Sequence, residues 1–232
     1  MDTMDIIRRT KAAWGCLRSM PPQEKSRLLC AMADALVRQK EEILRCNDLD
    51  VAAARERVSP VMLDRLRLDG GRIDAMAQGI RAVAQLPDHT GRILSEVQRP
   101  NGMTIYKKQV PLGLVAIIYE SRPNVTSDAA ALAIKSGNVC VLRSGRDAIG
   151  SAKAITAALK AGITAAGGDP DILNILEDTS HESARELMQA KGLVDLLIPR
   201  GGAGLIRACV ENATVPCIET GTGICHVYVD AD

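Results

Sequence analysis

Phenylalanine is absent from this 232-residue chain, and aromatic residues make up only 2% of it. Proteins that hold single-stranded nucleic acid by stacking its bases need aromatic platforms, so the composition argues against that class. Neither sign of charge dominates, because 29 basic and 28 acidic residues leave a net charge of +1. The chain therefore has no basic field for nucleic acid and no charge block typical of a disordered tail.

Motifs typical of metal sites, disulfide frameworks and common nucleotide loops are also missing. Seven cysteines form no C-x-x-C pair, and three isolated histidines lack the spacing of metal ligands. We therefore expect no metal site and reduced, mostly buried thiols. The sequence contains neither G-x-G-x-x-G nor the P-loop pattern. No run approaches the roughly 18 apolar residues of a membrane span, and no signal-peptide core is visible, so we expect a cytoplasmic protein.

The first ninety residues show apolar side chains at helical spacing. Ser59-Pro60 is expected to open one helix and Asp69 to cap another. The predicted helices cover residues 2–17, 22–44, 50–57, 60–67 and 69–86. Residues 92–98 and 103–109 then alternate in polarity around Asn101-Gly102, which predicts a β-hairpin. A lone hairpin is only marginally stable, so we expect it to need a partner surface.

Strand and helix patterns alternate after residue 110, which predicts a doubly wound parallel sheet. Leu112 to Tyr119 is an apolar run suited to a strand buried on both faces. The next helix is expected to begin at Thr126 or Ser127, with Asp128 in its first turn. Further strands are predicted at 139–142, 172–176, 193–198, 215–218 and 226–229, and further helices at 148–166, 180–190 and 205–210.

Polar loops follow three of these strands. Ligands of open α/β sheets bind outside the carboxyl ends of the strands, where Glu120 to Asn124 and Arg143 to Arg146 are expected. Gly201 to Gly204 precedes a helix, and backbone N–H groups at such a start hold phosphate well. Ordinary connecting loops and a glycine-rich turn without a ligand remain alternatives.

Several sequence blocks resemble a known family. They are Met62–Leu66, Val110–Gly113, Ile118–Glu120, Arg122–Thr126, Gly137–Asn138, Leu197–Leu205 and Cys225–Asp230. With these blocks in order, the chain resembles the N-terminal half of the γ-glutamyl phosphate reductases, within the aldehyde dehydrogenase superfamily. The resemblance implies an aldehyde-dehydrogenase-like α/β fold, with N-terminal helices, a doubly wound parallel sheet and a projecting β-hairpin. Residues 1–232 would form the NADP-binding domain, with residues 92–109 as an arm for homo-oligomer assembly.

The resemblance also assigns catalytic roles. Asn124 matches the asparagine whose side-chain amide stabilises the oxyanion, although an Asx-type turn would be the reading without the family match. Arg122 would face the substrate's carboxylate or phosphate, or else form a structural salt bridge. The family's nucleophilic cysteine is expected in a domain beyond residue 232. Cys225 beside His226 is a weaker candidate because neighbouring strand residues point to opposite faces. Glu219 falls near a hydrolytic base of the superfamily and receives no role.

Cofactor residues follow from the same match. Arg143 stands where the superfamily has a lysine at the adenosine ribose or its 2′-phosphate, and Arg146 is close by. Two arginines can hold a 2′-phosphate bidentately, which predicts NADP(H) over NAD(H), although both could be plain surface residues. The other expected cofactor contacts are Tyr119, Glu120, Ser121, Ser144, Gly145, Gly201 and Gly202. The superfamily lacks the usual dinucleotide fingerprint, so its absence here fits.

The implied activity is NADPH-dependent reduction of L-glutamyl 5-phosphate to L-glutamate 5-semialdehyde and phosphate, on the route to proline. This chain would be the cofactor-binding part and is expected to be inactive alone. Two other functions remain open: oxidation of free aldehydes by an aldehyde dehydrogenase, and a non-catalytic nucleotide-binding or interaction module.

Overall fold

A four-stranded parallel sheet forms the centre of the protein, which is described here by a computed structural model covering residues 2–219 and 226–230. Its strands are β3 (Leu114–Tyr119), β4 (Val139–Ser144), β5 (Leu173–Ile175) and β6 (Leu196–Arg200), in the spatial order β5-β4-β3-β6. All six residues of β3 are buried, as its apolar run predicts. The chain runs from β3 outward to β5 and then returns to β6 on the other side of β3. This reversal creates a topological switch point between β3 and β6.

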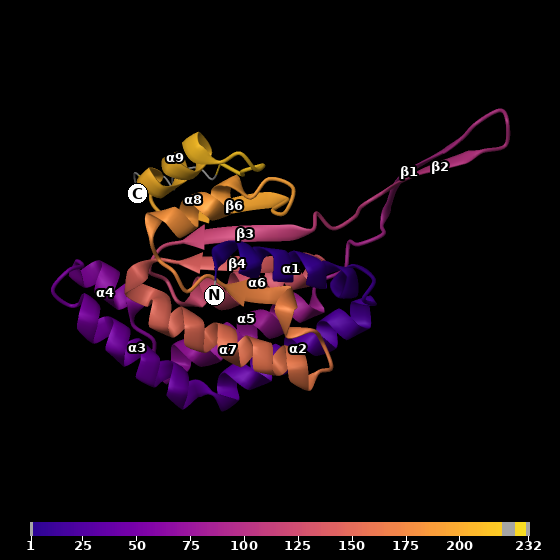
Figure 1. Cartoon of the computed structure of the whole chain (residues 1–232). Helices are drawn as coiled ribbons and strands as arrows, with labels where there is room; N and C mark the ends of the chain where they lie inside the picture. Colours follow the sequence, from indigo (N-terminus) through magenta and orange to yellow (C-terminus); the bar gives the residue numbers. More distant parts are fainter. Residues whose placement is uncertain (1, 220–225, 231–232) are drawn as a thin grey trace.

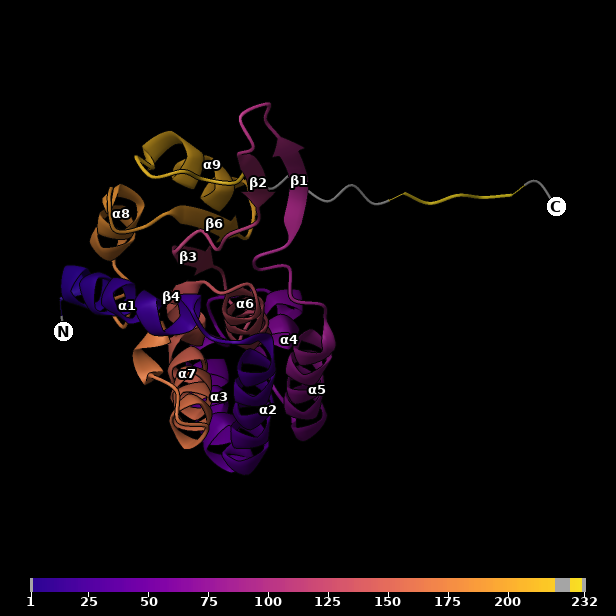
Figure 2. The same ribbon diagram turned by 90° about the vertical axis from the view of Figure 1, so that its right-hand side faces the viewer.

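Helices cover both faces of the sheet, which confirms the doubly wound fold (Figures 1 and 2). The crossovers through α6 (Asn124–Lys135) and α7 (Ile149–Ala165) place these helices on one face. On the other face, α1 (Thr3–Arg18) contacts β3, β4, β5 and α8 (His181–Gln189). The last helix, α9 (Ala203–Asn212), packs against β6 and α8.

Three further helices pack around α6 and α7: α2 (Pro22–Arg38), α3 (Lys40–Ala54) and α5 (Gly70–Gln85). The short helix α4 (Pro60–Leu66) packs against α3. Ser59 and Asp69 cap α4 and α5 as predicted, with side-chain oxygens 3.3 and 2.7 Å from the backbone nitrogens they accept from. The prediction of one helix through residue 44 was wrong. Gln39, at φ −100° and ψ 18°, separates α2 from α3, and Asp50 therefore lies inside α3. The apolar period continues across this turn because both helices bury their faces in the same core.

The predicted hairpin is confirmed. Strands β1 (Ile93–Gln98) and β2 (Thr104–Lys108) pair antiparallel, and Gly102 takes a positive φ of 83° in the connecting turn. The hairpin projects away from the body (Figure 1), and every residue of β1 is exposed. Its exposed apolar side chains include Ile93, Val97 and Ile105.

Three boundary predictions were wrong. Helix α6 begins at Asn124, because Pro123 already has helical angles and suits the start of a helix. Asp128 therefore lies beyond the first turn. The strand predicted at 215–218 is reduced to one parallel bridge between Leu197 and Cys217, and residues 226–230 form no strand. A strand needs a ladder of neighbours, and the described part of the chain offers 226–230 none.

The six described cysteines are all free thiols, but only Cys140 and Cys209 are buried. In the part of the chain that the structure describes, no helix is both long and apolar enough to span a bilayer.

Candidate functional site

The loops that follow β3 and β6 meet at the switch point. Backbone N–H of Glu120 donates to the carbonyl of Arg200 at 3.2 Å. Backbone N–H of Gly202 donates to the Glu120 carboxylate at 3.0 Å. Tyr119 pairs with Ser144 on one side and with Arg200 on the other, so the β4 loop belongs to the same edge. Ligands of open α/β sheets bind at such a point.

The glycine loop before α9 is a potential phosphate site. Gly202 is the N-cap of α9 and provides no capping side chain, so the N–H groups at the helix start face the loop region. Gly201 packs closely against Glu120, because an added Cβ would lie 2.6 Å from Cδ of that side chain. The carboxylate of Glu120 thus accepts from an N–H group at the start of α9.

The two arginines predicted to hold a 2′-phosphate are placed differently from each other. Arg143 lies within β4, and its Nη2 donates to the carbonyls of Thr179 and Ser180 at 2.7 and 3.0 Å. Its buried Nε has no hydrogen-bond partner in the described residues, and burial lowers the pKa of its guanidinium. Arg146 opens the short 3₁₀ turn η1 (Arg146–Ala148) and is exposed. Arg143 therefore already anchors the segment before α8, whereas Arg146 faces solvent.

Of the remaining predicted cofactor residues, some lie in the loops at the sheet edge and others are buried in the core. Gly145 lies close to Glu120 and Ser121, since a Cβ placed on it would be 3.6 Å from Glu120 Cα and Ser121 N. Tyr119 is fully buried, and its hydroxyl bonds to Thr126 Oγ1 at 2.7 Å. Desolvation raises the pKa of this phenol. Tyr119 is thus a core residue, and its hydroxyl is already hydrogen-bonded to Thr126. Ser144 is likewise buried.

Asn124 is the first residue of α6 and is exposed. Its Nδ2 donates to Asp128 Oδ2 at 3.2 Å, which uses one of the two amide hydrogens and leaves the other. Desolvation raises the pKa of Asp128, against smaller opposing effects from Asn124 and Ser127. The exposed Arg122 side chain forms no ion pair with any described residue, so the structural salt bridge considered for it is not seen.

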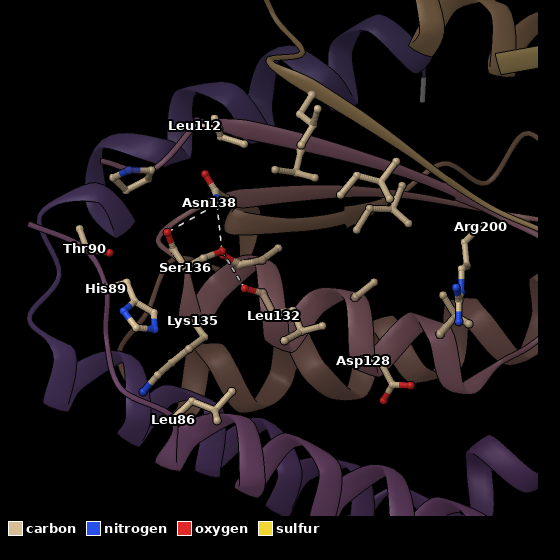
Figure 3. A pocket seen from close by; sticks show the side chains of 18 of the residues that line it. Leu86, His89, Thr90, Leu112, Asp128, Leu132, Lys135, Ser136, Asn138 and Arg200 are labelled. Carbon is tan, nitrogen blue, oxygen red and sulfur yellow. Dashed lines mark hydrogen bonds between the residues drawn. The ribbon is translucent and has the colours of Figure 1, made fainter. Parts of the chain in front are cut away.

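A mainly apolar cavity of about 810 Å³ runs along α6. It lies between α6, the segments that lead into and out of the hairpin, and the side chains of β3 and β6 on the α6 side of the sheet. Figure 3 shows Asp128 and Arg200 at one end and His89, Thr90 and Lys135 at the other. Such a volume and lining are typical of small-molecule sites.

A second cavity of about 620 Å³ adjoins the first near the start of α6. Arg122, Asn124 and Asp128 line both cavities. The second is polar, and its other lining residues are Asp64, Arg65, Arg67, Leu68, Arg72, Ala75 and Met76. Our sequence analysis missed Arg67 and the position of Asp128 in the site. No local signal marks them, because the α4–α5 link meets α6 only through tertiary packing.

Cys225 and Glu219 are the two remaining candidates. Cys225 lies outside the described residues, and Glu219 is exposed. Within residues 2–219 and 226–230, no group of His, Cys, Asp and Glu side chains could hold a metal ion.

Comparison with known proteins confirms the resemblance. The sequence model of the aldehyde dehydrogenase family matches residues 1–213. The γ-glutamyl phosphate reductase of Streptococcus suis is 60% identical over 210 residues, which is 90% of this chain and 51% of the relative. The Neisseria gonorrhoeae γ-glutamyl phosphate reductase is 56% identical over 231 residues, 100% of this chain and 55% of the relative. The chain thus spans about half the length of the curated relatives it matches.

Solved structures of other proteins have the same fold as this chain. The γ-glutamyl phosphate reductase of Thermotoga maritima superimposes with a TM-score of 0.94 at 38% identity, covering 96% of this chain and 54% of that one. A probable aldehyde dehydrogenase from Listeria monocytogenes shares the fold, with a TM-score of 0.74 at 16% identity over 95% of this chain and 46% of that one.

Proposed function

The chain belongs to the aldehyde dehydrogenase family, and from this we propose that it supplies the NADP(H)-binding part of a γ-glutamyl phosphate reductase. The complete enzyme would reduce L-glutamyl 5-phosphate to L-glutamate 5-semialdehyde and release phosphate, on the route to proline. The observation that supports this best is the meeting of three loops at one sheet edge. These are Glu120–Ser121, Ser144–Gly145 and Gly201–Gly202.

Each loop suits one part of a dinucleotide. The N–H groups at the start of α9 would hold the pyrophosphate after the Glu120 carboxylate turns away. Arg146, with its exposed guanidinium, would bind the 2′-phosphate together with Arg143. When bound, NADPH supplies the hydride for the reduction.

Asn124 would act on the substrate. Its remaining amide N–H would donate to the oxygen that gains negative charge as the acyl carbon is reduced. Asp128 holds the other N–H and so fixes the amide plane. Loss of such a donor costs roughly 10²–10³ in rate. By resemblance, we place the nucleophilic cysteine in the part of the longer relatives that this chain does not span, and we expect no turnover by this chain alone.

The hairpin would serve in assembly. Its exposed apolar side chains fit a second copy of the protein, in a homo-oligomer joined through residues 92–109.

A fluorescence titration of this chain with NADPH and, in parallel, NADH tests the cofactor role. We expect saturable binding, with NADPH at least roughly tenfold tighter, since a phosphate–arginine pair contributes about 1.5–3 kcal/mol. Arg146→Ala should weaken the binding of NADPH and leave the affinity for NADH unchanged. Arg143→Ala should also weaken NADPH, but it removes the contacts to Thr179 and Ser180 as well. Arg38→Ala, at the end of α2 away from the three loops, is the control for loss of charge.

Equal affinity for the two nucleotides would refute the 2′-phosphate assignment. Absence of binding by either would refute the proposal that this chain holds the cofactor by itself. Circular dichroism of each variant separates these results from loss of fold.

A further inference from the structure

The polar cavity beside Asn124 has no role in cofactor binding as described above. It lies between the link from α4 to α5 and the start of α6, and it opens onto the same three residues as the apolar cavity. A substrate whose reacting end lies at Asn124 could therefore extend its other end into this cavity. The charges along its wall indicate which chemical group fits there.

Some of these charges already satisfy each other. Arg72 Nη1 donates to the carbonyls of Asp64 and Arg67 at 2.5 and 2.6 Å, and its Nη2 contacts the Asp64 carboxylate at 3.1 Å. Arg72 and Asp64 thus form a closed pair that neither attracts nor repels a ligand strongly.

Two arginines of the cavity have no such partner. Among the described residues, no carboxylate pairs with Arg67 or Arg122, and no side-chain hydrogen bond is formed by either guanidinium. Arg65 has only a weak contact with Met62 Sδ at 3.9 Å. The cavity therefore carries uncompensated positive charge in a fork geometry that matches a carboxylate.

One negative group faces the same space. The Asp128 carboxylate accepts from the Asn124 amide, and no Lys or Arg in the described chain pairs with it. Asp128 is exposed and lines both cavities, so its carboxylate is accessible to a ligand and could form an ion pair with a bound ammonium group. The cavity thus offers acceptors for both charges of a zwitterion.

We propose that this cavity is the subsite for the α-amino-acid end of the substrate, with Arg67 and Arg122 binding the α-carboxylate and Asp128 the α-ammonium group. The proposal rests on the proposed function for the identity of the substrate, and it adds the residues that determine specificity. A site with both charges selects an α-amino acid over a plain dicarboxylate or an ω-amino acid. A ligand that lacks one of these charged groups leaves a charged side chain of the cavity unpaired. This lowers the binding affinity more than the loss of one methylene contact would.

Binding of three probes to this chain tests the subsite, with calorimetry or ligand-observed NMR as the readout. The probes are L-glutamate, glutarate, which lacks the ammonium group, and 4-aminobutyrate, which lacks the α-carboxylate. We expect saturable binding of L-glutamate that exceeds binding of the other two. Arg67→Gln and Arg122→Gln should weaken L-glutamate by roughly tenfold to a hundredfold, the loss expected for a charge-assisted hydrogen bond. They should leave 4-aminobutyrate unchanged.

Asp128→Asn should weaken the binding of L-glutamate but not that of glutarate. Arg27→Gln is the matched control, because Arg27 is an exposed arginine of α2 outside the cavity. Absence of saturable L-glutamate binding, equal binding of the three probes, or a control effect as large as that of Arg122→Gln would each overturn the proposal.

An NADPH titration of the same samples keeps the two proposals apart. Retained NADPH binding without selection of L-glutamate refutes the subsite and leaves the cofactor role standing. Selective L-glutamate binding without NADPH binding supports the subsite and refutes the cofactor role.

Discussion

Asp88→Asn is expected to destabilise the fold strongly. Asp88 lies in the segment between α5 and β1, and its Oδ2 is 2.5 Å from Nζ of Lys25 on α2. The side chains of Lys25 and Asp88 are only 2% and 6% exposed. Thr90 completes the cluster, since its N–H donates to Asp88 Oδ1 at 2.8 Å and its hydroxyl accepts from Lys25 at 3.3 Å. The pair thus ties the base of the hairpin to the helical layer.

The magnitude follows from the burial. An amide at position 88 leaves the Lys25 ammonium group buried without its counter-charge, which costs about 3–5 kcal/mol. In a chain of this size, 1 kcal/mol shifts Tm by roughly 2–4 °C, so we expect a fall of about 6–20 °C. Replacing both partners by apolar residues, as in Lys25→Met with Asp88→Leu, should recover most of this loss.

The pH dependence has a defined sign. Burial would raise the pKa of Asp88, but hydrogen bonds from Lys25 and Thr90 outweigh it and lower the pKa below its usual value. A carboxylate with a lowered folded-state pKa stabilises the protein fully above its unfolded pKa, about 3.9. This contribution is lost as the pH falls through the folded-state pKa. The difference in stability between wild type and Asp88→Asn should therefore be largest near pH 7 and should shrink below about pH 4.

Thermal melting followed by circular dichroism, from pH 7 down to pH 3, measures both effects. Glu42→Gln is the matched control on an exposed ion pair. Hydrogen bonds from Arg45 lower the pKa of Glu42 to about 2, but the two side chains are 56% and 62% exposed, and solvent screens the pair. We expect little change in its Tm. A fall for Asp88→Asn no larger than for Glu42→Gln would refute the reasoning, as would a difference that grows in acid.

Two further predictions concern the site edge and the helical packing. Glu120→Gln should tighten NADPH binding by several-fold, because it removes a competing negative charge from the N–H of Gly202; unchanged or weaker binding would contradict this. Gly162→Ala should lower the stability by about 1–3 kcal/mol in denaturant unfolding, because its Cβ would lie 2.6 Å from Met32 Cα. Gly15→Ala should instead raise the stability by about 0.5–1 kcal/mol, because the space around Gly15 is open. Equal effects of the two glycine substitutions would contradict the packing argument.

Patterns of neighbouring residues were enough to predict much of the fold. The apolar run ending at Tyr119 predicted a doubly buried strand, and Asn101-Gly102 predicted the hairpin turn. Boundaries were less secure where two local signals competed. Thr126 and Ser127 are good capping residues, yet Pro123 had already set the helical angles, and α6 begins at Asn124.

The sequence by itself determined the family, the order of the elements and the strand ends at which polar loops gather. These properties depend on periodicity and on residue types within a few positions of each other. Only the tertiary structure decided that the Glu120 carboxylate occupies the start of α9, that Arg143 is held by Thr179 and Ser180, and that Arg67 lines the same cavity as Arg122. Such contacts join residues tens of positions apart, and they depend on how helices and strands pack around one core, which no local pattern specifies.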